Sequence, residues 1–116
     1  MNCIFVTNRP NYCHRRFAES IRCSFYHVRH FVREDIPLIS LPLNGMLNAR
    51  ILPDSEVYFA ESIMDYYPVY YKHTEGKKII LIAEDTLSKL NKMSNIKRNY
   101  ILKIFNSCDG FIAISE

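Results

Sequence analysis

Four short runs of apolar residues constrain the fold of this chain most strongly. They lie at residues 2–7, 56–61, 77–83 and 111–115, and they favour the β-branched and aromatic residues common in strands. Each run is continuous rather than alternating, which indicates a strand buried on both faces. Helical patterns separate several of the runs. Together they predict an α/β fold with a doubly wound, mainly parallel, Rossmann-like sheet in a single domain.

Two long helices are predicted near 14–33 and 87–106, inside segments that run from about Cys13 to Glu34 and from Thr86 to Ser107. In both segments apolar residues recur at gaps of three or four, as on one face of a helix. A partial helix is also expected in the tyrosine-rich stretch, with Ser62 and Asp65 at its start and Gly76 at its end.

The segment "IPLISLPL", residues 36–43, is predicted to be a strand, which Pro37 and Pro42 weaken or place near a sheet edge. The pair Asn44-Gly45 after it predicts a turn, and residues 46–52 fit no single element. The expected order is therefore strand, helix, strand, strand, helix, strand, helix, strand.

Composition limits the classes of function that this chain can have. Its net charge of +3 is too small to predict nucleic-acid binding. No apolar run approaches the roughly 18–20 residues that span a bilayer, and the N-terminus has no basic leader. We therefore expect a cytoplasmic protein. Its four cysteines lack a C-x-x-C pair and are expected to be free thiols, with two of them in the core, Cys3 and Cys108.

The segments 56–61, 77–85 and 109–116, with the basic helix before the last of them, resemble the N-terminal half of a GT-B glycosyltransferase. The resemblance is greatest to the large retaining family that uses nucleotide sugars. In that family the N-terminal domain commonly ends on an Asp-led apolar strand of the type found in "CDGFIAISE". The residues that match this pattern are Asp109, Gly110, Ala113, Ser115 and Glu116.

This resemblance implies that residues 1–116 form the acceptor-binding domain and that a second domain, absent from the chain, binds the nucleotide-sugar donor. The complete enzyme would then act on a sugar or lipid acceptor, and this half would be inactive alone. The missing half implies self-association, or exposed aromatic residues at the rim, such as Tyr12, Tyr66 and Tyr67. No cofactor is expected. Relatives often carry a glycine-rich loop after the first strand, whereas "NRPNYCHRRF" contains no glycine.

Candidate site residues follow from the rule that ligands bind beyond the carboxyl ends of parallel strands. The residues predicted to bind the acceptor are Asn8, Glu61, Glu84, Asp85, Ser115 and Glu116, and those predicted to contact phosphate are Arg9, Arg15 and Arg16. Glu84 comes directly after the clearest strand and is expected to face the cleft. Asp85 and Ser115 equally suit the caps of the helices that follow them.

Other features leave alternatives open. Cys23, His27 and His30 could share a helix face and bind zinc, but no fourth ligand completes the set. The basic helix over 86–105 would suit contact with an anionic membrane at the inner face, or it is simply a solvated face over the sheet. The alternative function is a non-catalytic Rossmann-like interaction module that docks through its tyrosine-rich segment.

Overall fold

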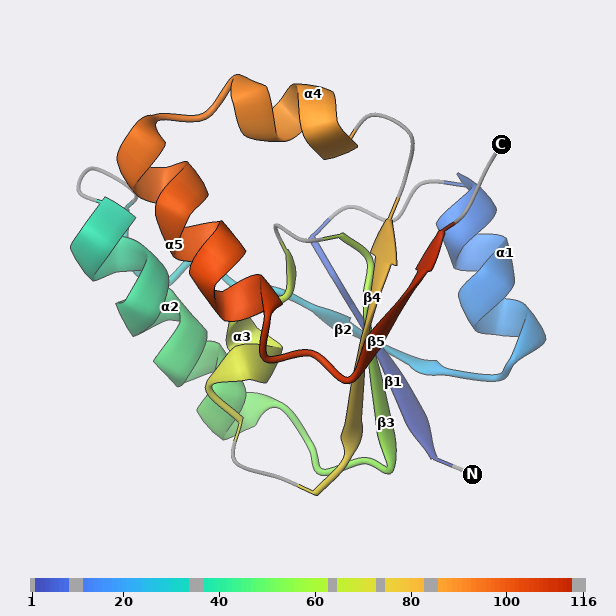
Figure 1. Cartoon of the computed structure of the whole chain (residues 1–116). Helices are drawn as coiled ribbons and strands as arrows, with labels where there is room; N and C mark the ends of the chain where they lie inside the picture. Colours follow the sequence, from blue (N-terminus) through green and yellow to red (C-terminus); the bar gives the residue numbers. More distant parts are fainter. Residues whose placement is uncertain are drawn as a thin grey trace.

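Five strands form one sheet in the order β2-β1-β3-β4-β5, and each neighbouring pair runs parallel (Figure 1). This computed structural model describes residues 2–8, 12–33, 37–62, 65–72, 75–82 and 86–113. The elements in chain order are β1 (Cys3–Thr7), α1 (Tyr12–Ser20), β2 (Ser24–His27), α2 (Pro37–Ile51), β3 (Val57–Ala60), α3 (Tyr67–Tyr70), β4 (Lys77–Ile82), α4 (Thr86–Asn91), α5 (Asn95–Phe105) and β5 (Gly110–Ala113). The predicted α/β class is confirmed.

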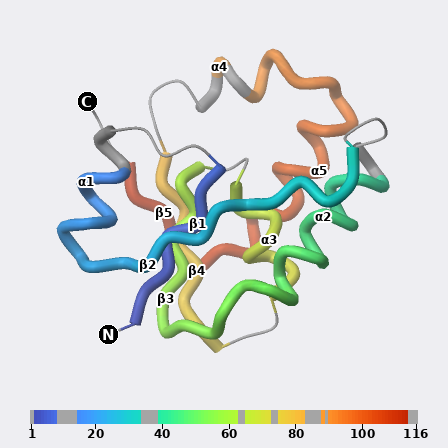
Figure 2. Tube along the Cα trace, turned by 180° about the vertical axis from the view of Figure 1, so that it is seen from behind, coloured from blue at the N-terminus to red at the C-terminus, as the bar shows by residue number. Residues whose placement is uncertain are grey.

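Helices cover both faces of this sheet. α1 lies on one face, while α2, α3 and α5 lie on the other, as the two opposite views show (Figures 1 and 2). The chain moves from β1 to β2 on one side and then to β3 on the other side. The topological switch point therefore lies between β1 and β3, and doubly wound sheets bind ligands there. β1, β3, β4 and β5 are consecutive neighbours, as predicted from the four apolar runs.

The predicted helix over 13–34 is wrong in its second half. α1 ends at Ser20, and β2 forms the sheet edge beside β1. The spacing of apolar residues here suits a helix, yet the Phe25 ring packs edge-on against Phe5 of β1, with centroids 5.6 Å apart. Backbone pairing with β1 and this ring contact outweigh the local helical pattern, because intrinsic helix propensity contributes little free energy beside tertiary contacts.

A Schellman motif ends α1 and directs the chain into β2. The Cys23 N–H donates to the Ala18 carbonyl at 3.0 Å, and the Arg22 N–H donates to the Glu19 carbonyl at 3.1 Å. Arg22 takes the left-handed position of the motif, with φ of 58°. Glycine usually occupies that position, since a side chain there crowds the backbone.

Replacing Arg22 by glycine should raise the free energy of unfolding by about 0.5–1 kcal/mol, because the left-handed strain is relieved. Urea unfolding followed by circular dichroism measures this change. Arg33→Gly is the matched control, because Arg33 is also exposed and its φ is not positive. The control should lose stability, since glycine only adds freedom to the unfolded chain. A loss of stability in both variants would contradict the strain assigned to Arg22.

The predicted strand over 36–43 and the turn at Asn44-Gly45 are both wrong, because residues 37–45 belong to the helix α2. Pro37 is its first residue, where a missing N–H costs nothing, but Pro42 lies inside it. The buried face of this helix mixes polar and apolar residues, namely Ser40, Leu41, Asn44, Asn48 and Ala49. Its exposed large apolar residues are Ile39, Leu43, Met46 and Ile51. Sequence patterns that look for one apolar stripe do not predict such a helix.

Two buried asparagines of α2 hold the chain that follows β2. The Asn44 side chain accepts from the Val32 N–H at 2.8 Å and donates to the Val32 carbonyl at 2.9 Å. The Asn48 side chain pairs with Arg29 in the same way, at 2.8 Å in each direction, and also accepts from the Tyr26 hydroxyl at 2.8 Å. These amides act as strand partners for the segment, and this explains the polar residues on the buried face of α2.

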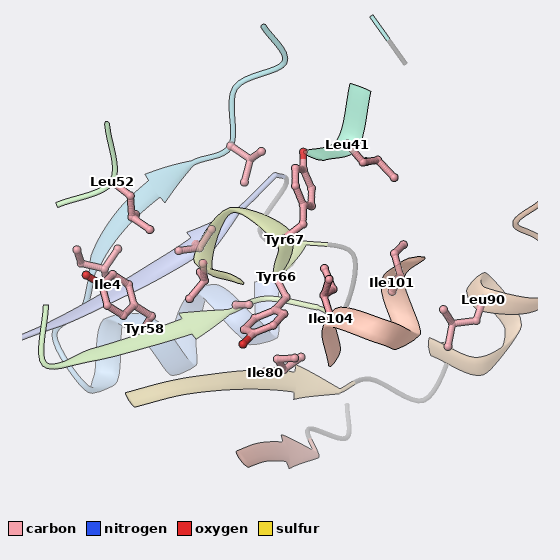
Figure 3. Packing of buried hydrophobic residues seen from close by; sticks show 14 residues of the cluster. Ile4, Leu41, Leu52, Tyr58, Tyr66, Tyr67, Ile80, Leu90, Ile101 and Ile104 are labelled. Atoms are coloured by element: carbon pink, nitrogen blue, oxygen red, sulfur yellow. The ribbon is translucent and has the colours of Figure 1, made fainter. Parts of the chain in front are cut away.

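The tyrosine-rich stretch belongs to the core. α3 is only one turn long, Tyr67–Tyr70, and ends before the predicted stop. Tyr66 and Tyr67 are 0% and 5% exposed, so their predicted exposure at the rim is wrong (Figure 3). The side chain of Tyr12 lies outside the described part. The Tyr66 hydroxyl pairs with Ser107 Oγ at 2.8 Å, and burial raises the pKa of Tyr66 to about 12.

The single helix predicted over 86–107 is two helices, α4 and α5. Ser94 caps α5, and its hydroxyl accepts from the Lys97 N–H at 3.3 Å. Ile101 and Ile104 of α5 are buried against the sheet in the larger core cluster, which also contains Tyr66 and Ile80 (Figure 3). A smaller cluster lies under α1, and its buried members are Cys3, Phe5, Ala18, Cys23, Val57, Phe59 and Leu81.

Candidate functional site

The carboxyl ends of β1, β2 and β3 meet at the switch point of the sheet. The Val28 N–H donates to the Thr7 carbonyl at 2.9 Å, and the Glu61 N–H donates to the Val6 carbonyl at the same distance. These bonds continue the strand pairing by one residue beyond each strand. They place Asn8, which follows β1, between the segment after β2 and the segment after β3. This is the edge where the sequence rule predicted a ligand site.

Glu61 is bound into the sheet at this edge. Its Oε2 accepts a hydrogen bond from the Thr7 hydroxyl, and both side chains are buried, with exposed fractions of 6% and 0%. A buried carboxylate needs such partners, because loss of hydration is costly. The hydrogen bond between Glu61 and Thr7 therefore links the end of β3 to the end of β1, next to Asn8.

Two further pairs of side chains lie around Asn8. The His30 Nε2 and the Asn8 Oδ1 are 3.4 Å apart, a distance that allows the ring N–H to donate to the amide oxygen. After β3, the Ser62 hydroxyl donates to Asp65 Oδ2 at 3.0 Å, while the Asp65 N–H donates to the Ser62 carbonyl at 3.1 Å. This turn holds the Asp65 carboxylate at the carboxyl edge of the sheet, and Asp65 is only 9% exposed.

A cavity of about 180 Å³ opens among these groups. Its polar lining is an amide, an imidazole, a carboxylate and an ammonium group, from Asn8, His30, Asp65 and Lys97. Its other lining residues are Val28, Leu41, Tyr67 and Ile101. We call this cavity with these eight residues the edge pocket. Sites for drug-sized ligands measure roughly 300–1,000 Å³, so the edge pocket suits one small ring or head group.

Hydrogen bonds from α2 and the N-terminal cap of α5 position two walls of the edge pocket. The bonds of Asn44 and Asn48 hold the segment that carries His30. The cap at Ser94 starts α5 one turn before Lys97. The walls therefore come from strand ends on one side and from three helices, α2, α3 and α5, on the other, and they hold charges of both signs. Such a lining can accept hydrogen bonds from hydroxyl groups and donate them to an anion.

The structure brings two of the predicted site residues together, Asn8 and Glu61. Arg15 and Arg16 are exposed on α1, where the Arg15 side chain pairs with Glu19 at 3.1 Å. The remaining predicted residues lie outside the described part, namely Arg9, Glu84, Asp85, Ser115 and Glu116. Their predicted roles therefore stay predictions.

Three residues of the edge pocket were missed by the sequence analysis. His30 was placed on a helix that is absent, Asp65 was assigned to a helix start, and Lys97 was assigned to a solvated face. A signal for His30 does exist. It follows the run "SFYHV", which is short and aromatic and has the character of a strand.

The helix face proposed for zinc does not exist. Cys23 is buried under α1, while His27 and His30 are exposed on and after β2. Among the residues that the structure describes, no three or more His, Cys, Asp or Glu side chains are grouped as a metal site would require. Strand geometry explains the difference, because residues four apart are neighbours on a helix but lie about 13 Å apart along an extended strand.

No known protein family matches this chain, and no curated protein or solved structure matches it either. Within the described part, none of the helices has the length and apolar character needed to cross a membrane.

Proposed function

We propose that this chain is the acceptor-binding domain of a nucleotide-sugar-dependent glycosyltransferase, and that the edge pocket holds a hydroxyl-rich acceptor group. One observation carries the proposal. The edge pocket lies at the switch point between β1 and β3 and is lined by Asn8, His30, Asp65 and Lys97. The match of "CDGFIAISE" to the family pattern supports the same assignment.

The chemistry of the lining suits a phosphorylated sugar or a sugar-phosphate head group. A carboxylate such as Asp65 accepts hydrogen bonds from sugar hydroxyls, and the Asn8 amide can both donate and accept. Lys97 offers a positive charge to a phosphate. Transfer of a sugar also needs stabilisation of the leaving diphosphate, which a donor-binding domain would supply. The acceptor domain alone should bind without catalysing transfer.

Binding can be tested by titrating the isotope-labelled chain with glucose 1-phosphate, methyl glucoside and inorganic phosphate in separate NMR experiments. We expect amide shifts at Asn8, Val28, His30 and Lys97 with glucose 1-phosphate. Lys97→Met should weaken that binding about tenfold, through loss of a charge-assisted hydrogen bond, while binding of methyl glucoside should change little.

Lys103→Met is the matched control, because Lys103 is exposed on the same helix and does not line the edge pocket. This control should bind all three compounds as the parent does. Absence of shifts at the edge pocket with both sugars would contradict the proposed site. Transfer from a nucleotide sugar by the isolated chain would contradict its role as an acceptor-binding half.

A non-catalytic interaction module is the second candidate, and one observation favours it. α2 exposes apolar side chains, with Ile39 61% and Met46 47% exposed. Leu43 and Met46 also line a groove of about 550 Å³, together with Tyr71 and Lys72. Docking through the most buried tyrosines is excluded, because Tyr66 and Tyr67 lie in the core. Concentration-dependent light scattering by the chain, without any binding of sugars, would favour this second candidate.

A further inference from the structure

Two buried cysteines lie in contact under α1. The Cys23 thiol donates to Cys3 Sγ with the two sulfur atoms 2.6 Å apart. Cys3 is the first residue of β1, and Cys23 comes directly before β2. Their exposed fractions are 5% and 9%. The two thiols are 20 residues apart in sequence, so the fold and not the local chain brings them together.

The register of β1 and β2 explains why the two thiols are in contact. Ile4 is paired with Ser24, so the preceding residues, Cys3 and Cys23, stand opposite each other. Both side chains belong to the cluster on the α1 side of the sheet. Adjacent strands lie about 4.7–4.9 Å apart. This spacing falls inside the range of about 4.4–6.8 Å between the Cα atoms of disulfide-bonded cysteines.

Bonds on each side hold the two residues in place. The Cys23 N–H donates to the Ala18 carbonyl within the Schellman motif. The Cys3 thiol lies 3.6 Å from the carbonyl oxygen of Ile21, in the same turn. Burial raises the pKa of the Cys23 thiol, so this group stays protonated at neutral pH. Reaction of the pair therefore requires transient opening of the end of α1, and a bond formed afterwards would be sheltered from reductants.

We propose that Cys3 and Cys23 form a redox site that a small-molecule disulfide, such as oxidised glutathione, converts to an intramolecular disulfide. One thiol loses its proton and attacks the glutathione disulfide, which gives a protein–glutathione mixed disulfide and one glutathione thiol. The second thiol then loses its proton and attacks the protein sulfur of that bond, which releases the second glutathione thiol. The two cysteines lose two electrons and two protons, and glutathione disulfide gains them. The new bond closes a loop that contains α1.

The test uses the full chain with Cys13→Ser and Cys108→Ser, because only Cys3 and Cys23 then remain of its four cysteines. After the folded variant is incubated with oxidised glutathione, its intact mass should fall by two hydrogens, and thiol titration in denaturant should find no free thiol. Its thermal midpoint should rise by roughly 10 °C, because the disulfide restricts the unfolded chain. A reductant should reverse both changes.

Cys3→Ala and Cys23→Ala, each made in that same background, are the controls, and neither should show a mass loss or a higher midpoint. Peptide mapping of the oxidised natural chain gives a second readout that needs no variant, and it should find the peptides of Cys3 and Cys23 joined. The proposal is overturned if both thiols survive conditions that fully oxidise the urea-unfolded variant. It is also overturned if the disulfide forms but lowers the thermal midpoint, since the bond would then be incompatible with the geometry of the folded sheet.

Discussion

Asn48→Leu should lower the free energy of unfolding by about 3–5 kcal/mol. Leucine has a similar volume but leaves the Arg29 N–H, the Arg29 carbonyl and the Tyr26 hydroxyl without their present partner, at 2.8 Å in each case. Each polar group left unpaired in a buried place costs about 1–3 kcal/mol. Asn48 itself is 0% exposed.

Urea unfolding monitored by circular dichroism measures this loss, and Asn99→Leu is the matched control. Asn99 lies on α5 and is exposed, so its replacement should change stability by less than about 0.5 kcal/mol. The Asn48 variant should also lose binding at the edge pocket, since the amide holds the segment that carries His30. Equal stability of the two variants would show that the side-chain hydrogen bonds of Asn48 contribute nothing to the free energy of unfolding.

Gly45→Ala should destabilise the protein by about 1–3 kcal/mol, although the same change inside an ordinary helix stabilises by up to about 1 kcal/mol. A Cβ atom at Gly45 would lie 2.6 Å from Cδ2 of Tyr71 and 3.0 Å from Cδ2 of Tyr67. Neither ring can yield easily. The Tyr71 hydroxyl pairs with the Tyr100 hydroxyl at 2.7 Å, and Tyr67 is buried in the core. The glycine therefore allows α3 to approach α2.

Thermal and urea unfolding of Gly45→Ala test this reversal of sign, with Gly110→Ala as the control. A Cβ atom at Gly110 meets nothing within 4 Å, so alanine should be neutral or slightly stabilising there. A gain of stability at Gly45 would mean that the two helices separate without cost. That result would remove the packing argument for the glycine.

Four of the five strands were predictable from local sequence. β1, β3 and β4 lie within their apolar runs and β5 overlaps the fourth, and a run of this kind has few places to be buried except inside a parallel sheet. The rule for parallel sheets then predicted where ligand groups gather. Asn8 and Glu61 do lie at one edge, because both directly follow neighbouring strands, while their binding of an acceptor stays a prediction.

The edge pocket was only half predictable. Asn8 needs no knowledge of packing beyond the strand it follows. His30 depends on β2, and Lys97 depends on where Ser94 interrupts the helical pattern. The pairing of β2 with β1 is a long-range contact that local patterns do not record. The cap at Ser94 is local, but the apolar spacing continues across it, so both residues were assigned to exposed helix surface.

Local sequence was therefore sufficient for the fold class and for four neighbouring strands, since continuous apolar runs favour burial in a parallel sheet. The predicted burial on both faces is wrong for β5, which lies at the end of the strand order and leaves Phe111 60% exposed. Long-range packing decided the two elements that local patterns got wrong. β2 is a strand because β1 offers a pairing edge, and α2 is a helix because Asn44 and Asn48 bond to the chain after β2. Hydrogen bonds to a distant backbone outweigh local propensity when the groups involved are buried, because leaving them unpaired costs more than an unfavourable helix.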